Sequence, residues 1–177
     1  MARLTRLISN VVAWVTGETP QFCGAVLDTY VYFLAKGYTM QNCMFLAKQI
    51  AHETGWGTSN SISLDNNPWG MNCVSTRETT QTGCRETPSG EVLGVYPNCW
   101  HSVRDRYLWD NYWGIDSHKA STRYPEAVGE RYHTSSGYIP AVMAVDESRI
   151  RRVMTWSMVV TPVEAFAVLG IIRRITS

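Results

Sequence analysis

The sequence predicts an α+β fold that is mainly α, a helical domain with one small β-hairpin lobe. Two stretches carry apolar residues at helical spacing, the first over 21–36 and the second over 39–55. Residues 79–87 are instead rich in threonine, residues 88–90 are the turn sequence Pro-Ser-Gly, and residues 91–96 alternate into valines. A chain of 177 residues suits one domain with one core.

Each predicted helix has recognisable ends. The first helix is expected to stop at Gly37, where a glycine is tolerated in the left-handed conformation that ends helices. Thr39 is a suitable N-cap for the second helix, which is expected to end at Gly55. Further helical patterns are expected from residue 102, over 124–131, over 139–145, over 147–156 and from residue 162.

The ends of the chain differ from its middle. We predict three segments, namely an N-terminal extension at 1–20, the main domain at 21–156 and an apolar C-terminal helix at 157–177. The run from Val153 to Ile172 spans 20 residues, which is long enough to cross a bilayer. Pro162 and Glu164 favour a short new helix instead. We expect this helix to pack on the domain, with contact to a membrane as the alternative.

Composition excludes one class of partner. The 16 basic and 15 acidic side chains leave a net charge of +1, so we expect no nucleic acid partner. The 7 tryptophans and 9 tyrosines greatly outnumber the 4 phenylalanines. Such amphipathic rings fill cores, and they also line grooves that bind sugars.

The five cysteines do not form a metal-binding or redox motif. No two of them have CxxC spacing, so we expect no metal and no cofactor. Cys23 and Cys43 lie in helical apolar patterns and are expected in the core. Cys73, Cys84 and Cys99 flank the predicted hairpin, where one disulfide could form.

The stretch from Ala47 to Gly70 is the strongest candidate for a functional site. It delivers one carboxylate, Glu53, to the end of a helix, and glycines at 55 and 57 then break the chain. Partial burial and the negative end of the helix dipole both disfavour the ionised form of such a carboxyl. Glu53 is therefore a candidate general acid, a role that requires a protonated group near neutral pH.

Five ordered segments resemble a known family. Residues 21–59, which contain ETGWG, are similar to the opening of the glucosaminidase domains of the flagellar-rod and autolysin type, in glycoside hydrolase family 73. The similarity covers about residues 20–155, although the Asp-Pro of the family's last turn is replaced by Ser136 and Gly137. The later segments are NNPWGM at 66–71, ETPSGEVLGVYPN at 86–98, HSVRDRYLW at 101–109 and YHTSSGY at 132–138.

The resemblance implies a lysozyme-like fold and an endo-β-N-acetylglucosaminidase that cleaves the β-1,4 bond after N-acetylglucosamine in peptidoglycan. It makes residues 21–156 a catalytic domain, with Glu53 as general acid and Glu86 as the second catalytic group. The residues expected to line the sugar cleft are Trp69, Tyr132, Tyr138 and Asn67.

The second carboxylate is less well defined than the first. Glu78 and Glu91 compete with Glu86, because the register of the hairpin does not follow from the sequence. Some glycosidases use the 2-acetamido group of the substrate as nucleophile, and then no second carboxylate is needed.

Several other residues have plainer interpretations. Trp56 is expected to pack in the core behind Glu53. The four histidines lack metal-ligand spacing. The Arg104-Asp105-Arg106 run is expected to form a solvated helix face.

Three alternatives to the glucosaminidase stay open. A muramidase or lytic transglycosylase would share the fold and the helix-end glutamate. A cysteine amidase or peptidase would use Cys99 with a histidine. A non-catalytic module would bind the cell wall or build a virion.

We expect action on peptidoglycan strands in the periplasm or cell wall, as a phage lysin or virion-associated enzyme made without a cleaved signal peptide. Membrane or virion contact would involve the C-terminal helix.

Overall fold

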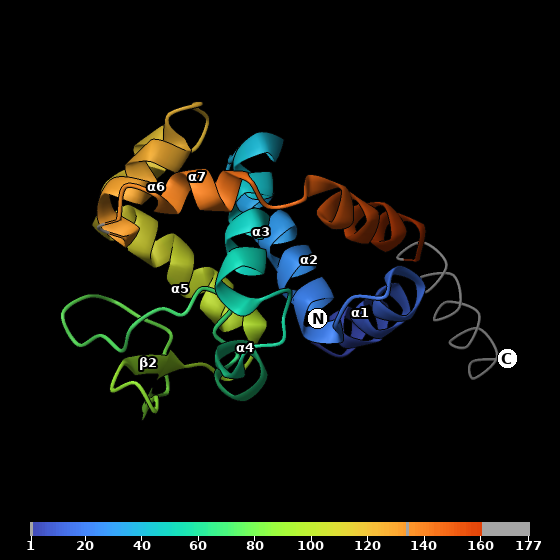
Figure 1. Cartoon of the computed structure of the whole chain (residues 1–177), viewed down its shortest axis with the longest axis horizontal. Helices are drawn as coiled ribbons and strands as arrows, with labels where there is room; N and C mark the ends of the chain where they lie inside the picture. Colours follow the sequence, from blue (N-terminus) through green and yellow to red (C-terminus); the bar gives the residue numbers. More distant parts are fainter. Residues whose placement is uncertain (1, 134, 161–177) are drawn as a thin grey trace, which may run out of the picture.

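The computed structural model describes residues 2–133 and 135–160, which form a helical body with a β-hairpin at one side (Figure 1). The predicted fold class, mainly α with a small β-hairpin lobe, is confirmed. The helices of the described residues are α1 (Ala2–Thr16), α2 (Pro20–Ala35), α3 (Met40–Thr54), α4 (Asn60–Asp65), α5 (Cys99–Tyr112), the 3-10 helix η1 (Ile115–His118), α6 (Tyr124–Tyr132), α7 (Tyr138–Met143) and a further helix at 147–160.

The ends of α3 follow from the residues that the sequence places there. The Thr39 hydroxyl accepts a hydrogen bond from the backbone N–H of Asn42 at 3.2 Å, which satisfies one of the unpaired donors of the first turn. At the other end Gly55 adopts a φ of 54°, a left-handed conformation that costs glycine little. Both predicted boundaries are confirmed.

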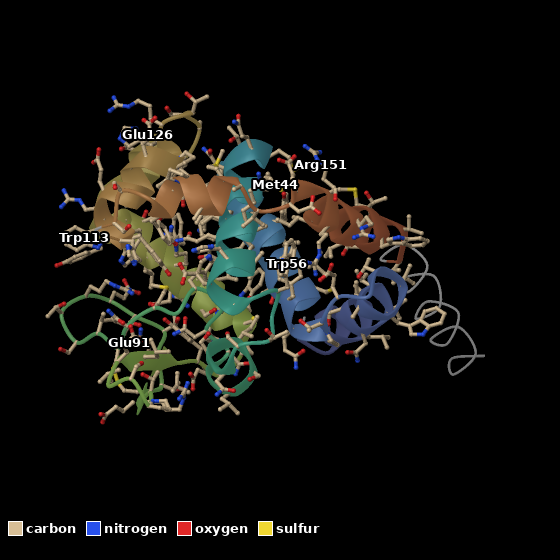
Figure 2. All side chains as sticks on the ribbon, in the orientation of Figure 1. Met44, Trp56, Glu91, Trp113, Glu126 and Arg151 are labelled. Carbon is tan, nitrogen blue, oxygen red and sulfur yellow. A yellow bond between two sulfur atoms is a disulfide. The ribbon has the colours of Figure 1, made fainter. Side chains whose placement is uncertain are left out.

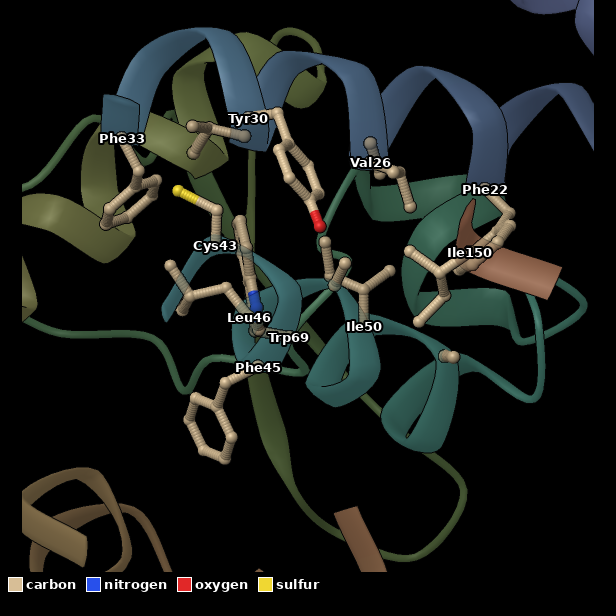
Figure 3. Close-up of a cluster of buried hydrophobic side chains, with 14 of the residues drawn as sticks. Phe22, Val26, Tyr30, Phe33, Cys43, Phe45, Leu46, Ile50, Trp69 and Ile150 are labelled. Atoms are coloured by element: carbon tan, nitrogen blue, oxygen red, sulfur yellow. The ribbon is translucent and has the colours of Figure 1, made fainter. Parts of the chain in front are cut away.

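The core lies between α2 and α3, with α1 and α5 packed on the remaining faces of α2 (Figures 1 and 3). Its central side chains are fully buried and include Phe22, Val26, Phe33, Leu46 and Ile50. Val12 of α1 and Ile150 of the helix at 147–160 belong to the same cluster. Residues within the predicted N-terminal extension therefore contribute to the core.

Trp56 lies at the edge of this core. Its ring is partly buried and meets the ring of Phe22 edge-on at 5.2 Å. The guanidinium of Arg149 covers the indole at 3.6 Å from the ring centroid and forms an ion pair with Glu18. Trp56 thus packs against the core on the turn that follows Glu53, as the sequence predicts.

The hairpin lobe is shorter than predicted. Strands β1 (Gly83–Glu86) and β2 (Val92–Val95) pair antiparallel, with Glu86 opposite Val92. A disulfide joins Cys73 to Cys84, which confirms one bond in the predicted group, whereas Cys99 is free. The disulfide closes the loop that runs from the cleft to β1.

The prediction of a solvated face at residues 104–106 is wrong. Asp105 and Arg106 are fully buried, and only Arg104 faces solvent. Asp105 accepts two hydrogen bonds from the guanidinium of Arg77, at 3.0 and 2.9 Å, and one from the Tyr96 hydroxyl at 2.7 Å. Asp105 is buried because partners from the hairpin lobe and its approach loop compensate its charge, and such distant partners are not visible in local sequence. Arg106 is compensated instead by Asp110, four residues along the same helix.

In the described part of the chain, no helix has the length and apolar character needed to cross a membrane. The predicted helix that starts at Pro162, with its membrane or virion contact, lies outside the described residues.

Asp28 provides a test of the packing around α2. Burial raises the pKa of its carboxyl from 3.8 to about 7, so the folded protein holds this proton at pH values where the unfolded chain releases it. The stability of the native protein should therefore fall as pH rises from about 4 to 7. We expect Asp28→Asn to raise the free energy of unfolding at pH 8 by on the order of 2 kcal/mol, with little effect at pH 4. Urea denaturation at both pH values measures this difference, and equal effects at both would contradict it.

Candidate active site

A cleft of about 690 Å³ separates the hairpin lobe from the helical body. The end of α3 and the turn at 69–72 form its floor, β2 and the loop before β1 form one wall, and α5 and α6 form the other. Glu91 lies on the hairpin side and Trp113 on the helical side (Figure 2). The volume suits a ligand of small-molecule or oligosaccharide size.

Glu53 lines this cleft from the last turn of α3. Its side chain is half-buried, and Oε1 accepts a hydrogen bond from the Tyr138 hydroxyl at 2.5 Å. Burial raises the pKa of the Glu53 carboxyl above its ordinary value, while the Tyr138 hydrogen bond and the nearby His52 and His133 partly offset the rise. The net effect favours the protonated acid, as a proton donor requires.

The second oxygen of Glu53 lies next to the turn that forms the cleft floor. Gly70 has a φ of 61°, and a Cβ atom built on it would lie 4.0 Å from Glu53 Oε2. Gly70 lines the cleft as well. The two oxygens therefore have different surroundings, since Oε1 meets Tyr138 and Oε2 lies at the floor.

Tyr138 connects Glu53 to a buried polar network. Gln49, one helical turn before Glu53, donates from Nε2 to the Tyr138 hydroxyl at 2.8 Å. The Oε1 atom of Gln49 accepts from Arg106 Nη2 at 3.4 Å, and Arg106 pairs with Asp110. Gln49, Arg106 and Asp110 are fully buried, and Tyr138 is 6% exposed. Tyr138 therefore holds Glu53, which differs from the sugar-contacting role expected for it.

Tyr132 lines the cleft, where the sequence predicts it. Its ring stacks on Tyr138 at 5.6 Å and meets Trp109 edge-on at 5.5 Å. Its hydroxyl donates to the backbone carbonyl of Trp69. The tyrosine thereby joins α6 to the cleft floor, and its ring is half-buried beside Glu53.

Trp69 and Asn67 support the floor from below. The Trp69 ring is fully buried among core residues that include Leu46 and Phe45 (Figure 3). Asn67 is also fully buried, and its amide donates to the carbonyls of Met71 and Gly94 at 2.8 and 3.0 Å. Trp69 is among the residues that line the cleft, although its side chain is fully buried, whereas Asn67 does not line it. Both residues support the cleft floor, and their contact with a sugar stays a prediction.

The hairpin carboxylate that lines the cleft is Glu91, while Glu86 does not line it. Side chains alternate along β1, and Arg85 uses the inward position to bind Asp65 of α4 through two hydrogen bonds at 2.7 and 2.5 Å. Glu86 therefore takes the exposed position. Glu91, which follows the turn, lies close enough for its charge to add to the rise in the pKa of Glu53.

Sequence reasoning missed other residues of the site. Gln49 precedes Glu53 by four positions, a spacing that places both on one helix face and could have indicated the contact. Arg106 and Asp110 have the same spacing. Trp113 and Arg131 line the cleft, with the guanidinium 5.0 Å from the indole centroid, and no local pattern marks them.

Two other chemistries find less support in this geometry. Cys99 does not line the cleft, and burial raises the pKa of its thiol to about 12, which disfavours a thiolate nucleophile. Within the described residues, no cluster of histidine, cysteine and carboxylate side chains could hold a metal ion.

Two solved structures are similar to this protein, and the first of them supports the fold. A chain in the type VI secretion system effector-immunity complex from Pseudomonas protegens is similar to this protein with a TM-score of 0.50 and 16% identity, over 77% of this chain and 98% of that chain. The catalytic domain of the autolysin Auto from Listeria monocytogenes gives a TM-score of 0.43 and 13% identity, over 86% of this chain and 87% of that domain. No family model and no curated protein matches the sequence.

The hydrogen bond between Tyr138 and Glu53 can be tested directly. Because this bond stabilises the ionised carboxylate, Tyr138→Phe should raise the pKa of Glu53 further. The ¹³C shift of the Glu53 carboxyl, assigned with Glu53→Gln, measures the pKa across a pH titration. An unchanged or lower pKa in Tyr138→Phe would contradict the role of this bond.

Proposed function

We propose that this protein is a lysozyme-like peptidoglycan hydrolase, a glycosidase that cleaves the β-1,4 bond after N-acetylglucosamine. The observation that supports this most is the half-buried Glu53, held by Tyr138 at the floor of an aromatic-lined cleft. The low-identity fold likeness and the ordered family segments are consistent with this function. Glu53 would be the general acid.

In the first step, protonated Glu53 would donate its proton to the glycosidic oxygen as the bond to the anomeric carbon breaks. The leaving sugar would depart with a new hydroxyl, and an oxocarbenium-like state would develop on the other sugar. Burial raises the pKa of the Glu53 carboxyl, which favours the protonated acid before the reaction. The carboxylate left on Glu53 would be stabilised by the Tyr138 hydroxyl, which already donates to Oε1.

We assign the second catalytic group to Glu91 in place of Glu86. Glu91 lies across the cleft from the helical wall and is exposed, so its carboxylate could activate water or stabilise the developing cation. The substrate's own 2-acetamido group is the competing nucleophile. Aromatic residues on the helical wall, Trp109 and Trp113 with Tyr132, would supply apolar faces for sugar rings.

We propose the periplasm or cell wall as the site of action. A phage lysin or virion-associated enzyme is the delivery route that the sequence suggested. Delivery as a secreted effector is the route raised by the likeness to a chain of a type VI effector-immunity complex. Both routes would bring the same catalytic cleft to peptidoglycan strands.

Digestion of purified peptidoglycan tests the reaction. The native protein should release fragments with new reducing N-acetylglucosamine ends, and Glu53→Gln should lower the rate by about 100-fold or more, since it removes the proton donor. Mass spectrometry of the fragments reads the bond that was cut. Reducing N-acetylmuramic acid ends would indicate a muramidase, and anhydro-muramic products a transglycosylase. No new sugar ends, together with retained wall binding by Glu53→Gln, would indicate a non-catalytic module.

A matched pair of hairpin variants tests the second carboxylate. Glu91→Gln should lower the lytic rate by about 100-fold, because it removes the cleft carboxylate, while Glu86→Gln should retain nearly native activity. Rates come from reducing-end release under identical conditions. Loss of activity in Glu86→Gln alone would restore the assignment made from the sequence. Native activity in both variants, with Glu53→Gln inactive, would favour the substrate's acetamido group.

A further inference from the structure

The polar network behind Glu53 has a fixed direction. Arginine carries only hydrogen-bond donors and stays protonated in proteins. The atom of Gln49 that faces Arg106 must therefore be the amide oxygen, which accepts from Nη2 at 3.4 Å. The amide nitrogen of Gln49 then faces Tyr138, to which it donates at 2.8 Å.

The direction continues through Tyr138 to Glu53. The hydroxyl oxygen of Tyr138 accepts a hydrogen bond from Gln49. Its single proton is therefore donated to Glu53 Oε1, and the two oxygens lie 2.5 Å apart. Because Oε1 already accepts this hydrogen bond, protonation of Oε1 would place two protons against each other and is unfavourable. The proton of the neutral acid therefore belongs on Oε2, the oxygen beside Gly70 at the cleft floor.

Arg106 is held firmly enough to set this direction. It pairs with Asp110 one helical turn further along α5, and Asp110 Oδ2 also accepts from the hydroxyls of Tyr38 and Tyr124 at 2.8 and 2.6 Å. The guanidinium also lies 4.4 Å from the ring centroid of Trp109. A fully buried arginine with these partners has little freedom to turn away from Gln49.

We propose that Gln49, oriented by Arg106, is a positioning residue that places the catalytic proton of Glu53 on Oε2, the oxygen beside the cleft floor. The inference rests on the proposed function, because the proton matters only if Glu53 is the acid. Without the Gln49 donor, the Tyr138 oxygen becomes free to accept a proton from Glu53. The acid could then carry its proton on Oε1, turned toward Tyr138 and away from a glycosidic oxygen in the cleft.

Two substitutions of Gln49 test the proposal. Gln49→Met keeps a similar volume and removes both polar atoms. Gln49→Glu keeps the shape but replaces the donor to Tyr138 with an acceptor, which would compete with Glu53 for the tyrosine proton. Gln41→Met is the matched control, because Gln41 is an exposed residue in the first turn of the same helix. Circular dichroism and thermal melting establish that each variant is folded.

Two readouts are needed, one independent of activity. In the ¹³C titration, the pKa of Glu53 should rise in Gln49→Met, rise further in Gln49→Glu and stay native in Gln41→Met. In peptidoglycan digestion, the plateau value of kcat should fall by about tenfold in Gln49→Met, with KM nearly unchanged. A loss of about tenfold is part of the rate enhancement that general acid catalysis supplies. The basic limb of the pH-rate profile should move to higher pH, because the acid stays protonated longer.

A double variant shows whether Gln49 acts through Tyr138. In a Tyr138→Phe background, Gln49→Met should cause no further change in the pKa of Glu53. An additional shift there, or an unchanged pKa in the single variant, overturns the proposal. If Gln49→Met shifts the pKa of Glu53 but keeps the native plateau kcat, the placement of the proton on Oε2 is overturned. Failure of the native protein to release sugar ends overturns the proposed function instead, and the titration distinguishes that failure because it needs no substrate.

Discussion

The buried ion pair between Arg106 and Asp110 is the interaction on which most of the site depends. Both side chains are fully buried, which costs several kcal/mol for each ion in desolvation and is offset only when their hydrogen bonds are nearly complete. Asp110 reaches that condition through Tyr38 and Tyr124. The pair thus fastens the turn before α3, the helix α5 and the start of α6 to one another.

The same pair links this scaffold to the cleft. Arg106 contacts Gln49 of α3 through a hydrogen bond and lies 5.5 Å from the ring centroid of Tyr132. Replacing the pair by apolar residues of similar volume could leave stability unchanged or even improve it. Such a replacement would leave Gln49 and Tyr138 without an orienting charge. The fold can therefore do without the ion pair, whereas the hydrogen-bond geometry of Glu53 depends on it.

The hairpin lobe is a separate structural unit held against the helices by polar contacts. Asn67 joins the floor turn to β2, Arg85 binds Asp65 of α4, and Arg77 binds Asp105 of α5. The apolar contribution of a two-stranded hairpin is small, and an isolated hairpin is marginally stable at best. These three attachments, with the disulfide that closes the loop, therefore fix the position of the wall that carries Glu91.

The sequence by itself determined the features that depend on local chemistry. Capping at Thr39, the glycine end of α3 at Gly55 and the hairpin with its Pro-Ser-Gly turn follow from backbone preferences within a few residues. The half-buried helix-end position of Glu53 follows from the same periodicity, since the apolar stripe of α3 reaches its last turn.

Only the tertiary structure decided which residues meet in the cleft. Glu91 rather than Glu86 lines it, because the inward position of β1 is occupied by Arg85 and its distant partner Asp65. Asp105 resembled a surface residue in the sequence, because its partner Arg77 lies in the loop before β1. Arg106 pairs with Asp110 on its own helix, and its contact with Gln49 of α3 appears only in the folded structure. Burial of a charge depends on a neutralising neighbour in space, and that neighbour can be anywhere in the chain.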